Sequence, residues 1–291
     1  MIHKYIGAHV SSAGGLENSI LRAHELEATA FSLFLSNQLQ WRIPILKEKT
    51  INNFVRLCKK YNYHSKSILP HSSYLVNLGH PDKNMREKSC YYFIQEIKCC
   101  YQLGLMMINI HPGSYLYKIT EKKCLENIID SINFILSKTE HIIIVLENTA
   151  GQGSNVGYCF EHLAFIIRHI KNKLRIGVCL DICHLFASGY QLNDINSFIF
   201  TFKKFHNLIG LKYLYGIHMN DSKRNFNSRL DRHHNLGYGK IKKYVFSNIV
   251  QTKEFQDIPL ILETKDKSLW KSEIRWLKQE SLLYTASFLN I

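Results

Sequence analysis

The feature that most restricts the fold of this chain is a regular alternation of short apolar runs with longer segments of helical period. Eight runs have the length and composition of buried β-strands, and a helix-like segment follows each of them. The expected strands span residues 5–9, 30–35, 67–71, 107–111, 142–147, 177–181, 215–218 and 259–263. The expected helices span residues 15–27, 50–61, 83–103, 122–138, 160–171, 193–208, 244–251 and 269–284. This alternation predicts an α/β fold, the (β/α)8 TIM barrel.

The length and composition fit this architecture as a single domain over residues 1–291. With 291 residues, of which 46% are hydrophobic, the chain can bury a large core. The N-terminus lacks the profile of a signal peptide, and no apolar run is long enough to cross a membrane. The 8 cysteines show no disulfide spacing. We therefore expect a soluble, cytoplasmic protein with reduced cysteines and no membrane partner.

The formal net charge of +14 favours a polyanionic partner such as nucleic acid, because each neutralised phosphate releases counterions. A second interpretation remains open. The chain is rich in Lys, Ile and Asn, and drift in the base composition of a genome produces that pattern without any binding role. Charge alone therefore points toward nucleic acid without establishing it.

Histidines and carboxylates recur at the ends of the predicted strands. Six of them lie at or near the last residue of a strand, namely His71, His111, Glu147, Asp181, His218 and Glu263. In this barrel the C-terminal ends of the strands converge on the face that carries the active site. Three more lie in loops of the same face, namely His184, Asp231 and His233. Because imidazole and carboxylate groups bind zinc-like metals, the convergence predicts a metal centre.

Nine ligands exceed what one or two zinc ions need, at about four coordination positions each. With carboxylates that bridge ions, such a set suits a cluster of three metals. His184, Asp231 and His233 could hold one ion, and the other six residues a closely spaced pair. Two metals a few ångströms apart can clamp the attacking and leaving oxygens of a phosphoryl displacement. The pattern therefore suits hydrolysis of a phosphodiester.

Short motifs along essentially the whole chain resemble those of a known family. They are Gly7-Ala8-His9-Val10-Ser11, Pro70-His71-Ser72-Ser73-Tyr74-Leu75, Asn109-Ile110-His111-Pro112-Gly113, Leu146-Glu147-Asn148-Thr149-Ala150-Gly151, Gly177-Val178-Cys179-Leu180-Asp181, His218-Met219-Asn220-Asp221-Ser222-Lys223, Asp231-Arg232-His233 and Leu262-Glu263-Thr264. The sequence resembles endonuclease IV (AP endonuclease family 2), the metal-dependent apurinic/apyrimidinic (AP) endonucleases of base excision repair. No single motif is sufficient, but together they are highly specific.

The resemblance implies a barrel with three Zn²⁺ ions per chain, which manganese or iron could replace in part. The first ion would be held by His71, His111 and Glu147, the second by Glu147, Asp181, His218 and Glu263, and the third by His184, Asp231 and His233. Glu147 would bridge the first two ions, and Glu263 would orient the hydroxide that attacks the phosphorus 5′ to an abasic site. The products would be a 3′ hydroxyl and a 5′ deoxyribose phosphate.

The resemblance also implies the partner, which is double-stranded DNA with abasic sites or blocked 3′ ends, bound by a monomer. The side chains expected to hold DNA are Asn37, Gln38, Leu39, Tyr74, Leu75, Asn220, Lys223 and Arg232. Tyr74 and Leu75 could wedge into the base stack, and an abasic nucleotide costs least to extrude.

Two positions depart from the family pattern. Leu39 stands where the family usually has Arg, and Ile182 stands where it usually has Thr. Leucine can wedge but cannot touch phosphate, so we expect weaker and less salt-sensitive DNA binding at residue 39. Isoleucine cannot support a ligand by a hydrogen bond. No ligand itself is missing.

Two other functions fit part of the pattern. Metal-dependent sugar isomerases and epimerases use the same barrel with similar ligands, so the fold does not separate them from a nuclease. They need fewer ligands, which makes His184, Asp231 and His233 the discriminating set. The second rival is a catalytically inactive lesion-binding protein, which nine intact ligands argue against.

Three further side chains are expected at or near the predicted site. His9 ends the first predicted strand, and we expect it to support a ligand rather than bind metal. Cys179 and Cys183 flank Asp181, and we expect both to pack as small buried hydrophobes.

Overall fold

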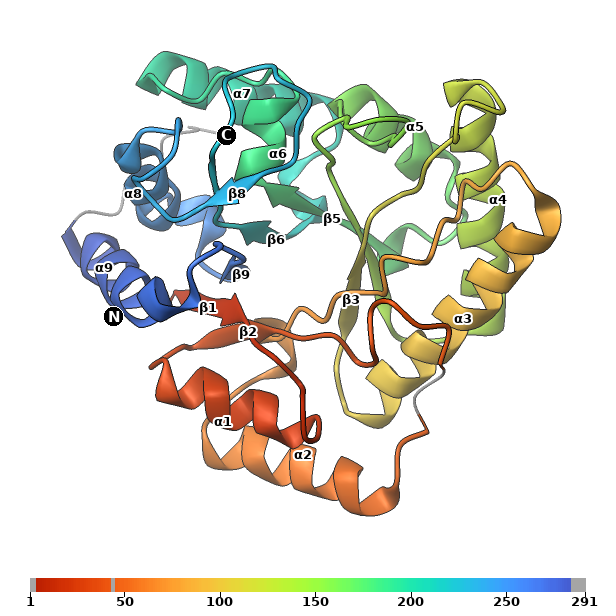
Figure 1. Cartoon of the computed structure of the whole chain (residues 1–291), viewed down its shortest axis with the longest axis horizontal. Helices are drawn as coiled ribbons and strands as arrows, with labels where there is room; N and C mark the ends of the chain where they lie inside the picture. The colour runs from red at the N-terminus through yellow and green to blue at the C-terminus, as the bar shows by residue number, and fades with distance from the viewer. Residues whose placement is uncertain (1–3, 43–44, 284–291) are drawn as a thin grey trace.

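The computed structural model describes residues 4–42 and 45–283, and a curled parallel sheet lies at its centre (Figure 1). The seven-stranded sheet has the order β2-β1-β9-β6-β5-β4-β3. Its strands are β1 (Tyr5–His9), β2 (Ala30–Ser32), β3 (Met107–Ile110), β4 (Ile143–Glu147), β5 (Ile176–Asp181), β6 (Leu214–His218) and β9 (Pro259–Leu262). Helices surround the sheet, which is the arrangement of a TIM barrel. The predicted fold class is confirmed.

The segment at residues 68–71 closes the barrel between β2 and β3, in the place of the remaining strand. The backbone N–H of Leu69 donates to Phe31 O at 3.0 Å, and that of Asn109 donates to Pro70 O at 2.7 Å. The segment is thus bonded on both sides, but it forms only isolated bridges. Proline has no N–H and interrupts a ladder of hydrogen bonds, which explains the irregularity around Pro70. The sequence predicts the place of this strand but not its irregular form.

The helices of the outer layer alternate with the strands along the chain. They are α1 (Glu17–Glu25), α2 (Glu48–Lys60), α3 (Lys83–Gln102), α4 (Glu121–Lys138), α5 (Phe160–His169), α7 (Ile195–Leu208), α8 (Lys243–Gln251) and α9 (Trp270–Leu283). Each agrees with a predicted helix to within a few residues. The last residue of the final predicted helix, Tyr284, lies outside the described residues. The side chains of Asp82 and Thr120 cap α3 and α4 by accepting hydrogen bonds from backbone N–H groups.

Two short structures at the mouth of the barrel, one helix and one pair of strands, were not predicted. α6 (Ile182–Ala187) begins directly after β5, and the Asp181 carboxylate caps it by accepting a hydrogen bond from His184 N at 2.8 Å. β7 (Asp221–Ser222) pairs antiparallel with β8 (His233–His234). Both elements are too short for hydrophobic periodicity to reveal, and both carry candidate ligands.

The barrel interior is apolar below the mouth. A buried cluster fills it, made of Leu69, Met107, Ile143, Val145 and Cys179. Side chains two positions apart on a strand point to the same face. Glu147 therefore lies above Val145, and Asp181 above Cys179. The apolar cluster is the floor beneath the charged residues.

Two expectations drawn from composition concern the cysteines and the membrane. All 8 cysteines lie among the described residues, and no disulfide joins any of them. Across residues 4–42 and 45–283, no helix has both the length and the apolar character that a membrane span requires.

Phenylalanines attach α7 to the rest of the core. Phe202 is fully buried, and its ring centroid lies 4.8 Å from that of Phe198 and 5.0 Å from that of Phe255. Phe200, on the opposite side of the same helix, is 69% exposed. The two positions offer a matched comparison of a core and a surface aromatic.

We expect Phe202→Ala to lower the free energy of unfolding by about 3–5 kcal/mol, because it removes buried area and leaves a cavity. Phe200→Ala should change it by about 0.5 kcal/mol or less. Urea unfolding followed by circular dichroism measures both. Equal effects of the two substitutions would contradict the packing described for α7.

Candidate metal centre

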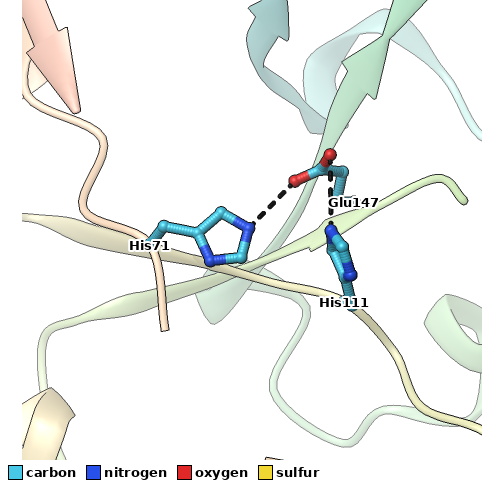
Figure 2. A group of neighbouring side chains, drawn as sticks. All are labelled: His71, His111 and Glu147. Atoms are coloured by element: carbon cyan, nitrogen blue, oxygen red, sulfur yellow. Dashed lines mark ion pairs between the residues drawn. The ribbon is translucent and has the colours of Figure 1, made fainter. Parts of the chain in front are cut away.

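The first group of candidate ligands is His71, His111 and Glu147, whose ligand atoms all lie within 4.8 Å of one another. Figure 2 shows both imidazole rings directed at the Glu147 carboxylate. His71 Nε2 lies 3.3 Å from Glu147 Oε2, and His111 Nε2 lies 3.6 Å from Oε1. Three residues from three neighbouring segments of the barrel wall thus converge at one point.

The second group is Glu147, Asp181, His218 and Glu263, again within 4.8 Å of one another. His218 Nδ1 lies 3.2 Å from Glu147 Oε1, 3.2 Å from Glu263 Oε2 and 3.8 Å from Asp181 Oδ2. Glu147 belongs to both groups. The two groups are therefore adjacent, with one carboxylate between them.

The third group is His184, Asp231 and His233, which lies toward the rim. Asp231 Oδ2 is 3.1 Å from His184 Nε2, and Oδ1 is 3.3 Å from His233 Nε2. α6 positions His184, and the β7–β8 pairing positions His233. The three groups that the family resemblance implied are thus brought together in space.

The histidine rings of these groups are oriented by backbone carbonyls. The Nδ1 atoms of His71, His184 and His233 lie 2.7, 2.9 and 3.3 Å from the carbonyl oxygens of Ser72, Asn148 and Glu263. A carbonyl only accepts, so each Nδ1 carries a proton, which leaves each Nε2 as the atom that would bind a metal. This is how histidine ligands are ordinarily held.

The donor set fits a metal cluster. The buried Nε2 atoms of His184 and His233 make no well-formed hydrogen bond and face the Asp231 carboxylate at 3.1 and 3.3 Å, and a buried polar atom without a hydrogen bond is costly. A metal ion at each group would satisfy these atoms and neutralise the clustered carboxylates. Nitrogen and oxygen ligands at this density suit zinc or a similar transition metal. The ligand chemistry therefore agrees with the geometry.

Neighbouring charges within the site shift the pKa values of its carboxylates and histidines. Burial alone would raise the pKa of Glu147, but His218 and His111 hold it well below its ordinary value. Burial would likewise raise the pKa of Glu263, yet His218 and His9 lower it strongly. Conversely, burial would lower the pKa of His184, but Asp181 and Asp231 raise it well above the usual range. The carboxylates of Glu147 and Glu263 are thus ionised, and the His184 ring holds its second proton tightly.

The pKa of His218 is shifted in the same way as that of His184. Burial would lower its pKa, but Cys179 and the carboxylates of Glu147 and Glu263 raise it well above the ordinary value. His9 supports a carboxylate rather than joining a ligand group, since its Nδ1 lies 2.7 Å from Glu263 Oε1. That contact agrees with the expectation for His9.

One predicted DNA contact requires correction. Asn220 is fully buried, and its side chain is occupied on both ends. Its Nδ2 donates to Asp181 Oδ2 at 2.6 Å, and its Oδ1 accepts from Glu263 N at 2.7 Å. It offers no surface to DNA, so the prediction of a DNA contact is wrong. The alternation rule does not extend past the end of β6, which is why the burial of this side chain was not foreseen.

The other residues expected to hold DNA lie at the surface around the site. Leu39 is 70% exposed and Tyr74 is 56% exposed. The Tyr74 ring lies 5.5 Å from that of His71, beside the first group. Asn37, Lys223 and Arg232 are also exposed, whereas Gln38 and Leu75 are half-buried. A cleft of about 720 Å³ runs along this side and is lined by His9, Asn37, Gln38, Tyr74, Glu263, Lys265 and Lys267 among others.

Several residues of the site were missed by sequence reasoning. Buried Glu96 of α3 accepts from Ser72 Oγ at 2.5 Å and from Ser73 N at 3.1 Å, so it anchors the segment between His71 and Tyr74. Burial raises its pKa to about 7. Asn109 donates to Glu147 Oε2. A polar residue on the apolar face of a helix was the available signal for Glu96.

The two departures from the family pattern lie in different surroundings. Ile182 is fully buried within the hydrophobic core. Asp181 beside it receives its hydrogen bonds from His184 N and Asn220 Nδ2 instead. Leu39, by contrast, lies on an exposed loop where its side chain meets solvent.

Comparison with known proteins defines the relationship. A family model described as a xylose isomerase-like TIM barrel matches residues 20–280. The chain is 55% identical over 279 residues to a probable endonuclease 4 of Buchnera aphidicola subsp. Acyrthosiphon pisum (strain Tuc7), covering 96% of this chain and 99% of that protein. It is 56% identical over 274 residues to a probable endonuclease 4 of Buchnera aphidicola subsp. Baizongia pistaciae (strain Bp), with coverage of 94% and 99%.

A solved structure agrees with these relatives. Endonuclease IV from Thermus thermophilus matches with a TM-score of 0.82 and 27% identity, covering 95% of this chain and 98% of that one. The fold and its candidate metal centre thus define the class, a xylose isomerase-like TIM barrel. Within that class, the chain belongs to the endonuclease IV family and is an enzyme of the nuclease type.

We expect metal uptake by the chelator-treated protein to release protons, because His184 and His218 have raised pKa values and must lose a proton to become ligands. Protons compete with the metal at low pH, and that competition weakens as the pH rises through the raised pKa values. The apparent metal affinity should therefore increase with pH. Calorimetric titration at pH 7 in two buffers of different ionisation enthalpy tests this, and identical heats in both would contradict it.

Proposed function

We propose that this chain is a DNA repair enzyme that cleaves the phosphodiester 5′ to abasic sites and leaves a 3′ hydroxyl and a 5′ deoxyribose phosphate. The observation that carries the proposal is the convergence of nine nitrogen and oxygen ligands into three adjacent groups at the mouth of the barrel. Membership of the endonuclease IV family supports it. The same site would trim blocked 3′ ends, and the enzyme would act as a monomer.

Zinc, three ions per chain, is the metal we propose, with partial replacement by manganese or iron. His71, His111 and Glu147 would hold the first ion. Glu147, Asp181, His218 and Glu263 would hold the second, and His184, Asp231 and His233 the third. When bound, the metals would supply charge neutralisation and a nucleophile at neutral pH.

The protein's own groups would orient the reaction. Glu263 is held from two sides, by His9 at Oε1 and by His218 at Oε2, so its carboxylate has one orientation toward the cluster. An ionised, fixed carboxylate can direct the attacking group and take its proton. Glu147 would be shared by the first two ions, because its carboxylate lies 3.3 Å from His71 Nε2 of the first group and 3.2 Å from His218 Nδ1 of the second.

The surface around the cleft would bind and distort the DNA. Tyr74 and Leu75 directly follow the Ser72-Ser73 segment that Glu96 anchors, so a wedge at these positions would have a rigid base. Lys223, Arg232 and the cleft lysines Lys265 and Lys267 supply positive charge for phosphates. The net charge of +14 is consistent with this partner.

The sugar isomerase or epimerase alternative shares the barrel. Its chemistry needs no third ligand group and no exposed wedge beside the site. His184, Asp231 and His233 favour the nuclease, because they add a separate position for charge on a leaving oxygen. An inactive lesion-binding protein would have no need of a complete ligand set.

The direct test is incision of a duplex that carries one tetrahydrofuran abasic analogue. We expect a cut on the 5′ side of the analogue, and a strong chelator should abolish it. Glu263→Gln should slow the reaction about 10²-fold or more, since it removes the general base while keeping the shape. Glu126→Gln, a substitution at an exposed surface ion pair of α4, is the matched control. Intact DNA with fully metallated protein would overturn the proposal.

Leu39→Arg should restore a phosphate contact at a site where the side chain is 70% exposed, without a cost in folding. We expect tighter binding of the abasic duplex and a steeper salt dependence, by roughly 0.9 in the slope of log K against log salt. Leu39→Met is the uncharged control. Fluorescence anisotropy at several salt concentrations measures both quantities, and no gain in affinity would sink this idea.

A further inference from the structure

Asn220 lies between two carboxylate ligands that come from different strands. Its side chain has no exposed surface. One end donates to Asp181 Oδ2 at 2.6 Å, and the other end accepts from the backbone N–H of Glu263 at 2.7 Å. Asp181 ends β5, whereas Glu263 directly follows β9, and β6 lies between these strands in the sheet. A single amide therefore spans the end of β6 and joins the residues on either side.

Asp181 is within reach of two different ligand groups. Its Oδ2 lies 3.8 Å from His218 Nδ1 in the second group and 3.5 Å from His233 Nε2 in the third. Asp181 also forms a separate combination with Cys183 and His233, whose ligand atoms lie within 4.8 Å of one another. The distances alone would let the Asp181 carboxylate bind a metal in more than one of these groups. A further contact is needed to determine which group it belongs to.

We propose that Asn220 is a positioning residue that assigns Asp181 to the second ion and couples it to Glu263 as one unit. The proposal rests on the proposed function, since it concerns the binding of that ion. His184 N holds Asp181 Oδ1 at 2.8 Å and Asn220 Nδ2 holds Oδ2, so both carboxylate oxygens are fixed, and the amide that fixes Oδ2 also binds Glu263, which shares the second group with Asp181. The same amide fixes the backbone at Glu263.

An asparagine amide satisfies both demands at this position. The contact to Asp181 Oδ2 needs a donor, because it lies within hydrogen-bond distance of a carboxylate oxygen, and the contact to Glu263 N needs an acceptor. Aspartate supplies the acceptor but places an oxygen against Asp181 Oδ2. Serine is too short to reach both partners. Loss of one ligand-orienting hydrogen bond typically weakens metal binding about 10–100-fold.

The experiment compares zinc occupancy of the wild-type chain and Asn220→Asp across a series of chelator-buffered free zinc concentrations. Zinc per chain is measured by atomic emission after gel filtration. We expect the variant to lose one ion at free zinc concentrations about 10–100-fold above those at which the wild type loses it. The other two ions should be retained at the wild-type concentrations.

Asn127→Asp is the matched control, because Asn127 is a buried asparagine of α4 that takes no part in the ligand groups. It should lower the melting temperature without changing zinc occupancy. Asn220→Ser, which introduces no charge, provides a second test should Asn220→Asp fail to fold. Serine should also release one ion selectively.

Wild-type occupancy in both Asn220 variants would overturn the inference and leave the proposed function intact. Loss of all three ions in proportion would also overturn it, since that is what a merely structural residue would cause. A wild-type chain that binds no zinc at any concentration would instead contradict the proposed function itself.

Discussion

The Glu147 carboxylate is the point of contact on which the arrangement of the barrel mouth depends. It is 1% exposed, and its oxygens lie 3.2 to 3.6 Å from nitrogens of His71, His111, His184 and His218. An ionised carboxylate is tolerated at this depth only because opposite charge and hydrogen-bond donors surround it. The first two ligand groups share this carboxylate, and His184 links it to the third. The rest of the site is built outward from it.

Two different structural features position the ligands around Glu147. The strand period of two directs ligands inward above the apolar floor, so the first two groups follow from the barrel itself. The third group depends on local structure at the mouth. The Asp181 cap of α6 turns the chain so that His184 faces Asp231, and the β7–β8 pairing returns His233 to the same place. Asp181, which is both a candidate ligand and the cap of α6, thus connects the barrel to its rim.

Much of the fold was predictable because periodicity reports burial directly. Strands such as β1 and β4 were predicted within a residue, and the ligands at their ends followed from the topology. Asn220 was misassigned, because direction cannot be read past a strand end. Glu96 and the irregular segment at Pro70 depend on contacts between residues distant in sequence. Local pattern marks Glu96 as a polar residue on an apolar face and Pro70 as a break in a strand, but it does not identify the groups that they contact.

We propose that the three ligand groups hold three metal ions. Crystals of the purified enzyme, with anomalous diffraction recorded on either side of the zinc absorption edge, test it most directly. We expect three peaks, one at each group, with ligand distances of roughly 2.0–2.3 Å. A single peak, or a peak held by Asp181, Cys183 and His233 in place of the third group, would contradict it.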